Sequence, residues 1–308
     1  MKATATLITI IILLFAQGAD ALVPRATFSK PQRAEIRDCD RWDLLVVKFN
    51  EGTGIRLRDG KFISQTNTDI RELEDLMSVY PEVRVARIFQ RPEEIYEMEK
   101  ISGERNSGRQ LADLNLYYAF GAKDRYEANI LLNDLNSMDL VEVAYAEPIA
   151  ELPDNPVPDI LLPPSYVESQ DYMEESPVGV NAYAAWGIPG GKGENVQFID
   201  VELAWVWTHQ DLPTPFYEGG TQNPDQGYRD HGTAVLGEIA SIENSFGTTG
   251  IAPLTSVGGQ AINVDDWPET VGAHFDAASA ALEPGDIWLI ELHGPGPGGD
   301  YIAMEYWQ

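Results

Sequence analysis

Apolar and polar positions follow different patterns in the two halves of the chain. In the first half, short apolar runs predict four strands, and apolar residues at helical spacing predict two helices. The strands are expected at residues 44–49, 83–89, 114–120 and 141–146, and the helices at 70–77 and 128–135. A polar stretch over 91–109 is expected to be a loop. The order β-α-β-β-α-β is the ferredoxin-like pattern, which predicts an α+β domain over residues 22–150.

From residue 178 onward, strand and helix patterns alternate. Strands are expected at residues 195–200, 256–262 and 286–292, and helices at 182–186, from His231 onward and at 271–282. Such alternation predicts a mostly parallel sheet with right-handed crossovers and helices on its faces. The fold class expected for residues 178–308 is therefore α/β.

Two segments outside these domains have distinct compositions. Residues 1–21 combine a positively charged start, a short apolar core and an Ala-x-Ala ending, which predicts a signal peptide and a secreted protein. No later stretch is apolar over a length that could cross a membrane. Prolines crowd the region of residues 151–177, which predicts an extended linker because proline fixes the backbone and cannot donate a hydrogen bond.

Charge and cysteine content narrow the function classes. The 308 residues include 49 Asp and Glu against 21 Lys and Arg, which gives a net charge of −28. Phosphate binding needs clustered Lys and Arg, so this balance argues against a nucleic-acid partner, and it disfavours an anionic membrane surface. Cys39 is the single cysteine and cannot form an intramolecular disulfide, so packing must supply the stability.

The candidate chemistry lies in the second half. Asp200 ends an apolar strand, and parallel sheets place their sites at the carboxyl ends of strands. His231 lies in Asp-His-Gly-Thr, where it is expected to open a buried helix, and Gly232 allows close backbone approach. A Gly-Ile-Ala-Pro turn follows at 250–253. These three elements, in this order, resemble the subtilisin-like (S8) serine peptidases from about residue 178 onward.

The resemblance implies a catalytic role for two of these residues. Asp200 would orient His231, and His231 would act as the base of an Asp-His-Ser triad. The family's Gly-Thr-Ser-x-Ala element and Ala-Gly-Asn element are not found between His231 and Gln308. We therefore expect the precursor to be truncated before its catalytic Ser, and the chain as given to be inactive. Glu202 stands where the family usually has Gly, and we expect it on the other face of the strand from Asp200.

The resemblance also suggests other parts of the function. Residues 22–150 would be a propeptide-like domain bound to the catalytic domain, residues 151–177 would carry the maturation cleavage, and the substrates would be peptides or proteins. Glu291 would flank the pocket for a substrate side chain, or it is simply a solvated residue at a strand end.

No cofactor is required. Structural calcium is common in the family, but no loop carries a clear ligand set. The pair His209 and Asp211 is weak evidence for zinc, so metal ligands are left unassigned.

Two functions of other classes stay open. The first is a non-catalytic protein whose propeptide-like domain binds or inhibits a peptidase. The second is a secreted binding module in which Asp200 and His231 are an ordinary buried polar pair.

Overall fold

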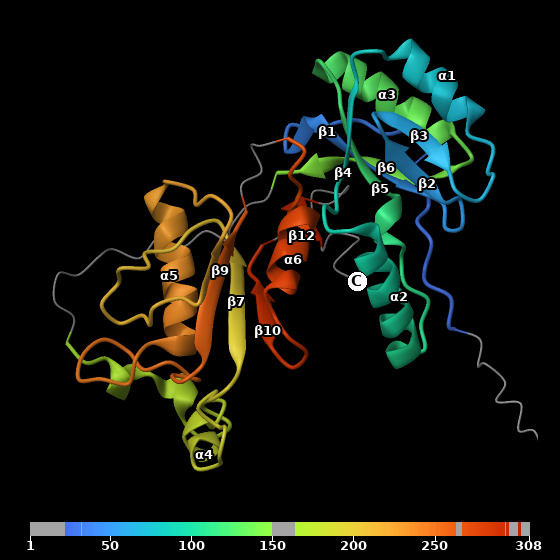
Figure 1. The fold of residues 1–308 in the computed structure, drawn as a ribbon. Helices are drawn as coiled ribbons and strands as arrows, with labels where there is room; N and C mark the ends of the chain where they lie inside the picture. Colours follow the sequence, from blue (N-terminus) through green and yellow to red (C-terminus); the bar gives the residue numbers. More distant parts are fainter. Residues whose placement is uncertain are drawn as a thin grey trace, which may run out of the picture.

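The described part of the chain forms two units, each built around its own sheet (Figure 1). The structure is a computed structural model that describes residues 22–31, 33–149, 164–262, 267–292, 294–295 and 301–302. The predicted signal peptide and the first part of the predicted linker lie outside these residues. Within the described residues, none of the helices combines the length and apolar character needed to span a membrane.

The first unit contains a four-stranded antiparallel sheet in the order β4-β5-β1-β6. Its strands are β1 (Asp40–Phe49), β4 (Arg84–Arg87), β5 (Tyr117–Gly121) and β6 (Val141–Pro148), and the helices α1 (Arg71–Val79) and α3 (Arg125–Ser137) lie together on one face (Figure 1). In the centre of the sheet, Val46 is in register with Ala119 on one side and Tyr145 on the other. The four strands and two helices predicted for this half are confirmed in type and order.

A hairpin and a helix of this unit were not predicted. A hairpin joins β2 (Ile55–Arg58) to β3 (Lys61–Ser64), and α2 (Glu93–Ser107) occupies most of the stretch expected to be a loop. The loop prediction was wrong because α2 buries only Tyr96, so its sequence has no apolar stripe. Glutamates in its first turn and a left-handed Gly108 at its end, with φ of 67°, favour the helix instead.

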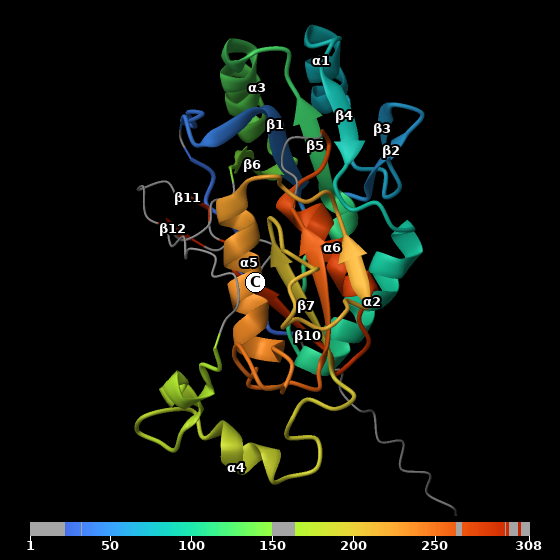
Figure 2. The same ribbon diagram turned by 90° about the vertical axis from the view of Figure 1, so that its left-hand side faces the viewer.

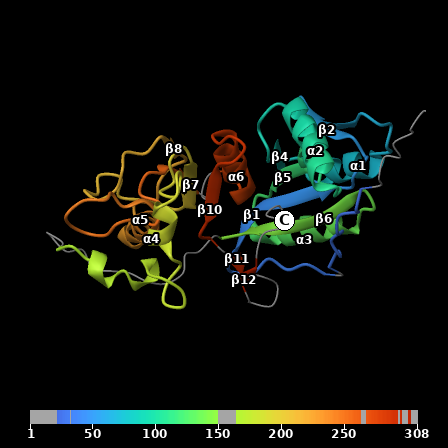
Figure 3. The ribbon, with the colours of Figure 1, turned by 90° about the horizontal axis from the view of Figure 1, so that it is seen from below.

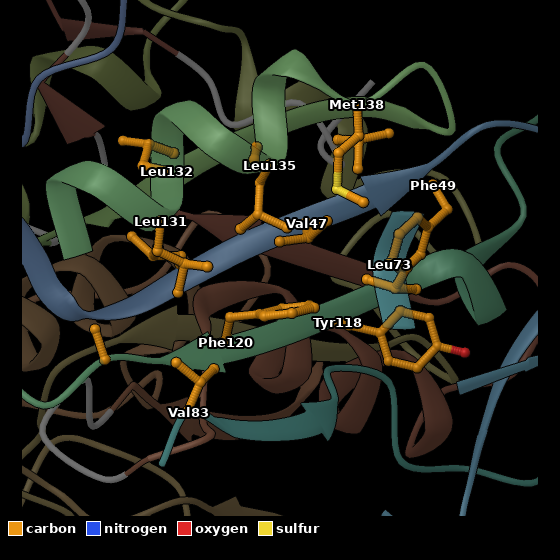
Figure 4. Packing of buried hydrophobic residues seen from close by; sticks show 14 of the residues in the cluster. Val47, Phe49, Leu73, Val83, Tyr118, Phe120, Leu131, Leu132, Leu135 and Met138 are labelled. Carbon is orange, nitrogen blue, oxygen red and sulfur yellow. The ribbon is translucent and has the colours of Figure 1, made fainter. Parts of the chain in front are cut away.

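The core of the first unit lies between the sheet and the pair α1 and α3. Val47 and Phe49 point from β1 into this layer, where they meet Leu135 and neighbouring side chains of α3 (Figure 4). Alternate residues of the same strand, Leu44 and Val46, belong to a second cluster that includes Tyr96 of α2. Strand β1 is therefore buried on both faces, which explains its nearly continuous apolar sequence.

The described end of the predicted linker is not extended. Residues 164–177 contain two short 3-10 turns, at Val167–Ser169 and Asp171–Met173. The Gln170 side chain donates to the Thr249 carbonyl and accepts from the Thr249 amide, which attaches this segment to the second unit. This part of the predicted linker 151–177 therefore contacts the second unit through polar side-chain hydrogen bonds, which composition does not reveal.

The second unit contains a parallel sheet in the order β10-β7-β9-β8. Its elements are α4 (Ala182–Trp186), β7 (Gln197–Glu202), β8 (Tyr217–Gly219), α5 (Gln226–Ala240), β9 (Ser256–Ala261), α6 (Val271–Ala280) and β10 (Ile287–Ile290). Helix α5 lies across one face (Figure 2) and α6 across the other (Figure 3). The prediction of a parallel sheet with flanking helices is confirmed. A separate pair of two-residue strands, β11 (Gly294–Pro295) and β12 (Tyr301–Ile302), follows.

Helix α6 lies between the sheet of the second unit and the first unit (Figure 3). Asp276, on this helix, accepts hydrogen bonds from Arg91 at 2.7 Å and from the Tyr96 hydroxyl at 2.5 Å. The Arg84 guanidinium of the first unit lies 4.4 Å from the centre of the ring of Trp267, which comes just before α6. The two units are therefore joined by charged and cation–π contacts at this helix.

Candidate functional site

The carboxyl end of β7 places two acidic side chains in the interior. Asp200 and Glu202 are both fully buried. Ile199 and Val201 pack in the cluster that contains α6, whereas Phe198 packs in the cluster that contains α5. Side chains two residues apart on a strand share a face, so Asp200 and Glu202 both lie on the α5 side with Phe198. The expectation that Glu202 points away from Asp200 was wrong for this reason.

His231 approaches the same face from α5. This helix begins at Gln226, after Asp225, whose side chain accepts from the Gly227 amide. His231 is therefore the sixth residue of the helix and does not open it, as the sequence had suggested. The cap at Asp225 starts the helix before its apolar stripe begins, and that moves His231 away from the positive helix terminus.

Gly232 lets α5 lie close to the chain that follows β7. A Cβ at this position would lie 2.3 Å from the Ala204 carbonyl oxygen and 2.9 Å from the Trp205 ring. The close approach predicted for Gly232 is present. Thr233 supports the same contact, because its hydroxyl accepts from the Val206 amide at 2.8 Å.

The carboxylate that contacts His231 belongs to Glu202. Its Oε1 lies 2.8 Å from His231 Nδ1. Asp200 instead accepts a hydrogen bond through Oδ2 from the indole Nε1 of Trp205, also at 2.8 Å. The structure therefore brings Asp200 and His231 to one site, but gives the orienting contact to Glu202. Residues 200 and 202 are two positions apart on a strand, so their side chains share a face. This spacing could have indicated Glu202 as the alternative partner of His231.

Burial dominates the electrostatics of the site. Desolvation raises the pKa of Asp200, against the lowering effect of the Trp205 hydrogen bond. Desolvation also raises the pKa of Glu202, and the nearby charges of Asp200 and Glu291 raise it further. Desolvation lowers the pKa of His231, with the charge of Glu291 acting in the opposite direction. At neutral pH the site thus favours a neutral imidazole, as a general base requires.

Glu291 follows β10 and is half-buried. It lies near enough to Asp200, Glu202 and His231 for its charge to affect the pKa of each. The structure therefore places Glu291 beside the candidate site. Its predicted contact with a substrate side chain stays a prediction.

A groove of about 380 Å³ borders the site on the side of the chain after β7. Trp205 and Trp207 stack with ring centres 5.2 Å apart. The groove is lined by Trp205, Trp207, Thr208, Gln222, Asn223, Pro224 and Arg229. Sequence reasoning missed this tryptophan pair because the segment after Asp200 had been considered only for the family's Asp motif.

The pair considered for zinc has another role. The Asp211 carboxylate accepts from Asn244 at 2.7 Å and from the Thr248 amide at 2.9 Å, while the Asp211 amide donates to His209 Nδ1. These contacts fix the loop after α5. Among the described residues, no group of three or more His, Cys, Asp or Glu side chains is arranged to hold a metal ion.

Comparison with known proteins gives a limited relationship to subtilisins. No family model matches the chain. Subtilisin E of Bacillus subtilis (strain 168) and subtilisin NAT of Bacillus subtilis subsp. natto are each 31% identical to it over 122 residues. The match covers 35% of this chain and 31% of each subtilisin, so the chain spans about a third of the length of these relatives. This similarity suggests a subtilisin-like relationship and a function related to serine proteases.

Proposed function

We propose that the chain is the N-terminal part of a secreted, subtilisin-like serine endopeptidase precursor, with its nucleophilic Ser in sequence beyond this chain. The observation that carries the proposal is the 2.8 Å contact between His231 Nδ1 and a fully buried Glu202 carboxylate. A partly exposed His oriented by a buried carboxylate, at the carboxyl end of parallel strands, is the arrangement that a triad needs. The partial similarity to subtilisins supports the same function.

The geometry determines which ring nitrogen would act on the nucleophile. Nδ1–H of His231 donates to Glu202, which leaves Nε2 as the acceptor. Nε2 takes the Ser hydroxyl proton as the hydroxyl attacks the peptide carbonyl, and later returns the proton to the leaving amine. The carboxylate of Glu202 stabilises the imidazolium between these two steps. Peptide hydrolysis through the resulting acyl-enzyme requires no cofactor.

The first unit supports the precursor half of the proposal. It contacts α6 through Arg91, just before α2, through Tyr96 of α2 and through Glu147 of β6. We assign residues 22–150 to a propeptide-like domain that binds the second unit, and the signal peptide at 1–21 would direct secretion. Cleavage between the units would release the catalytic part.

One observation favours a second candidate, a non-catalytic protein whose first unit binds or inhibits a peptidase. The first unit has its own sheet and its own core, separate from the clusters of the second unit. Residues 22–149 alone should then fold cooperatively and inhibit a mature subtilisin-like peptidase. If the coding sequence stopped after Gln308 and the chain inhibited a peptidase, this candidate would be preferred over the first.

The decisive experiment uses the protein extended by the coding sequence that follows Gln308. We expect it to hydrolyse a chromogenic peptide after maturation and to react with a serine-directed phosphonate. His231→Ala should lower kcat/KM by at least about 10³-fold, because the base is lost. The matched control is His209→Ala, an exposed histidine outside the site, which should keep most of the activity. Hydrolysis that survives His231→Ala contradicts the proposal.

A further inference from the structure

Among the described residues, each of the two buried carboxyl groups on β7 has a hydrogen-bond partner on one of its two oxygen atoms. Asp200 accepts from Trp205 through Oδ2, and Glu202 contacts His231 through Oε1. In the described part of the chain, the other two atoms, Asp200 Oδ1 and Glu202 Oε2, are buried and have no hydrogen-bond partner. Buried polar atoms without partners are costly and rare, so these two atoms require an explanation.

The two side chains are close neighbours. They lie two residues apart on one face of β7, where Cα atoms are about 6–7 Å apart. Carboxyl groups on such positions can reach one another. Two ionised carboxylates at this distance in a buried site would repel each other and would each lose their hydration. A single proton held between them removes the repulsion and gives both remaining oxygen atoms a partner.

We propose that Asp200 is protonated at Oδ1 and donates this proton to Oε2 of Glu202, so that Glu202 is the anion that positions His231. Asp200 is then a second positioning residue, which holds Glu202 in place. The inference rests on the proposed function for its catalytic meaning, because it assigns roles within the same site.

The neighbours of the pair determine which carboxyl group carries the charge. Glu202 faces His231, whose ring becomes cationic when it takes a proton, whereas Asp200 faces the neutral indole of Trp205. The further titratable group near the pair is Glu291, after β10, whose negative charge also disfavours a second anion on β7. Desolvation raises the pKa of both carboxyl groups, and an ionised Asp200 would raise the pKa of Glu202 further, so a proton on Asp200 removes the charge that opposes ionisation of Glu202.

This assignment reverses the effects expected of two isosteric substitutions. In Asp200→Asn, the amide can still accept from Trp205 and donate to Glu202, so it imitates a protonated Asp. In Glu202→Gln, the negative charge beside His231 is lost. If Asp200 were instead the charged partner of His231, Asp200→Asn would be the damaging change.

The test is an NMR titration of the full 308-residue chain. The side-chain carboxyl ¹³C shift of Asp200, assigned by through-bond correlation, should be that of a protonated carboxyl at pH 7. The ¹⁵N shifts of His231 should show a proton on Nδ1. The pKa of His231 should fall by about 1 unit in Glu202→Gln, and it should stay within about 0.3 unit of the wild-type value in Asp200→Asn.

Two results would overturn the inference. One is an ionised Asp200 at pH 7, which is measured on the wild-type chain and so does not depend on the folding of a variant. The other is a fall in the pKa of His231 in Asp200→Asn as large as that in Glu202→Gln. Neither readout requires hydrolysis. If the protein extended past Gln308 does not cleave peptides, that result contradicts the proposed function. It leaves the assignment of the proton to Asp200 unaffected.

Discussion

The carboxylate of Glu147, at the end of β6, accepts a hydrogen bond from the backbone amide of Val271, 124 residues later in the chain. Val271 is the first residue of α6, and both residues are buried. A side chain of the first unit thus caps a helix of the second, at the end where the helix dipole attracts a negative charge. Part of the stability of α6 therefore comes from the other unit.

This relationship predicts the effect of Glu147→Gln. The amide keeps the shape and an acceptor but removes the charge, so the free energy of unfolding should fall by about 1–2 kcal/mol. Urea unfolding followed by circular dichroism measures the change. Glu283→Gln is the control, because Glu283 is exposed and lies at the other end of α6. Equal unfolding midpoints for the two variants would contradict the prediction.

Glu51 predicts a pH dependence of stability. Burial raises its pKa, but Lys48 and Lys100, each 2.8 Å away, outweigh burial and lower the pKa to about 2. The pKa of the Glu51 carboxyl is therefore lower in the folded state than its value of about 4.3 in the unfolded chain. Its contribution is therefore fully present above pH 5 and is lost as the pH falls toward 2.

Glu51→Gln should destabilise the chain at pH 7 by about 1–2 kcal/mol, a figure reduced for solvent screening of this partly exposed group. The difference from wild type should shrink as the pH approaches 2. Urea unfolding at a series of pH values measures it. Glu82→Gln, at an exposed position of the same unit, should show no such pH-dependent difference. A destabilisation by Glu51→Gln that is independent of pH would rule out the charge as its cause.

Elements that bury an apolar face could be predicted from sequence, and α2 could not. Strands β1 and β6 and helix α3 show their burial as apolar periodicity, so their order in the chain was recovered. Helix α2 buries Tyr96 and is otherwise mostly polar, and a polar helix resembles a loop when only apolar spacing is considered. The contacts that α2 makes with the second unit, such as that of Tyr96 with Asp276, join residues far apart in sequence.

Asp200, His231 and Glu291 were named as candidate site residues from the sequence, but the partner of His231 and the role of Trp205 were not. Asp200 and His231 were expected to meet, and both are at the site. The choice of Glu202 as the partner of His231 depends on where α5 begins and on how closely it approaches β7. Trp205, whose indole N–H donates a hydrogen bond to Asp200, comes from a segment without regular periodicity. Sequence spacing gives the face of a strand, but contacts across elements require the packed structure.

The approach of α5 to β7 predicts opposite effects for two glycines in one helix. In Gly232→Ala, the new Cβ would lie 2.3 Å from the Ala204 carbonyl oxygen, so α5 must move away from the chain after β7. We expect a loss of about 1–3 kcal/mol in the free energy of unfolding. The same movement should lengthen the contact between His231 and Glu202 and shift the ¹⁵N resonances of His231.

Gly237→Ala is the matched control in the same helix. Its Cβ would meet only the Ser241 hydroxyl, at 3.3 Å, and alanine favours helix over glycine by about 0.8–1.0 kcal/mol. This variant should therefore be as stable as the wild type or more stable, with unchanged His231 resonances. Urea unfolding and the histidine NMR spectrum separate the two cases. If both substitutions stabilise the chain, α5 is not held against the Ala204 carbonyl, and the close approach cannot be what brings His231 to Glu202.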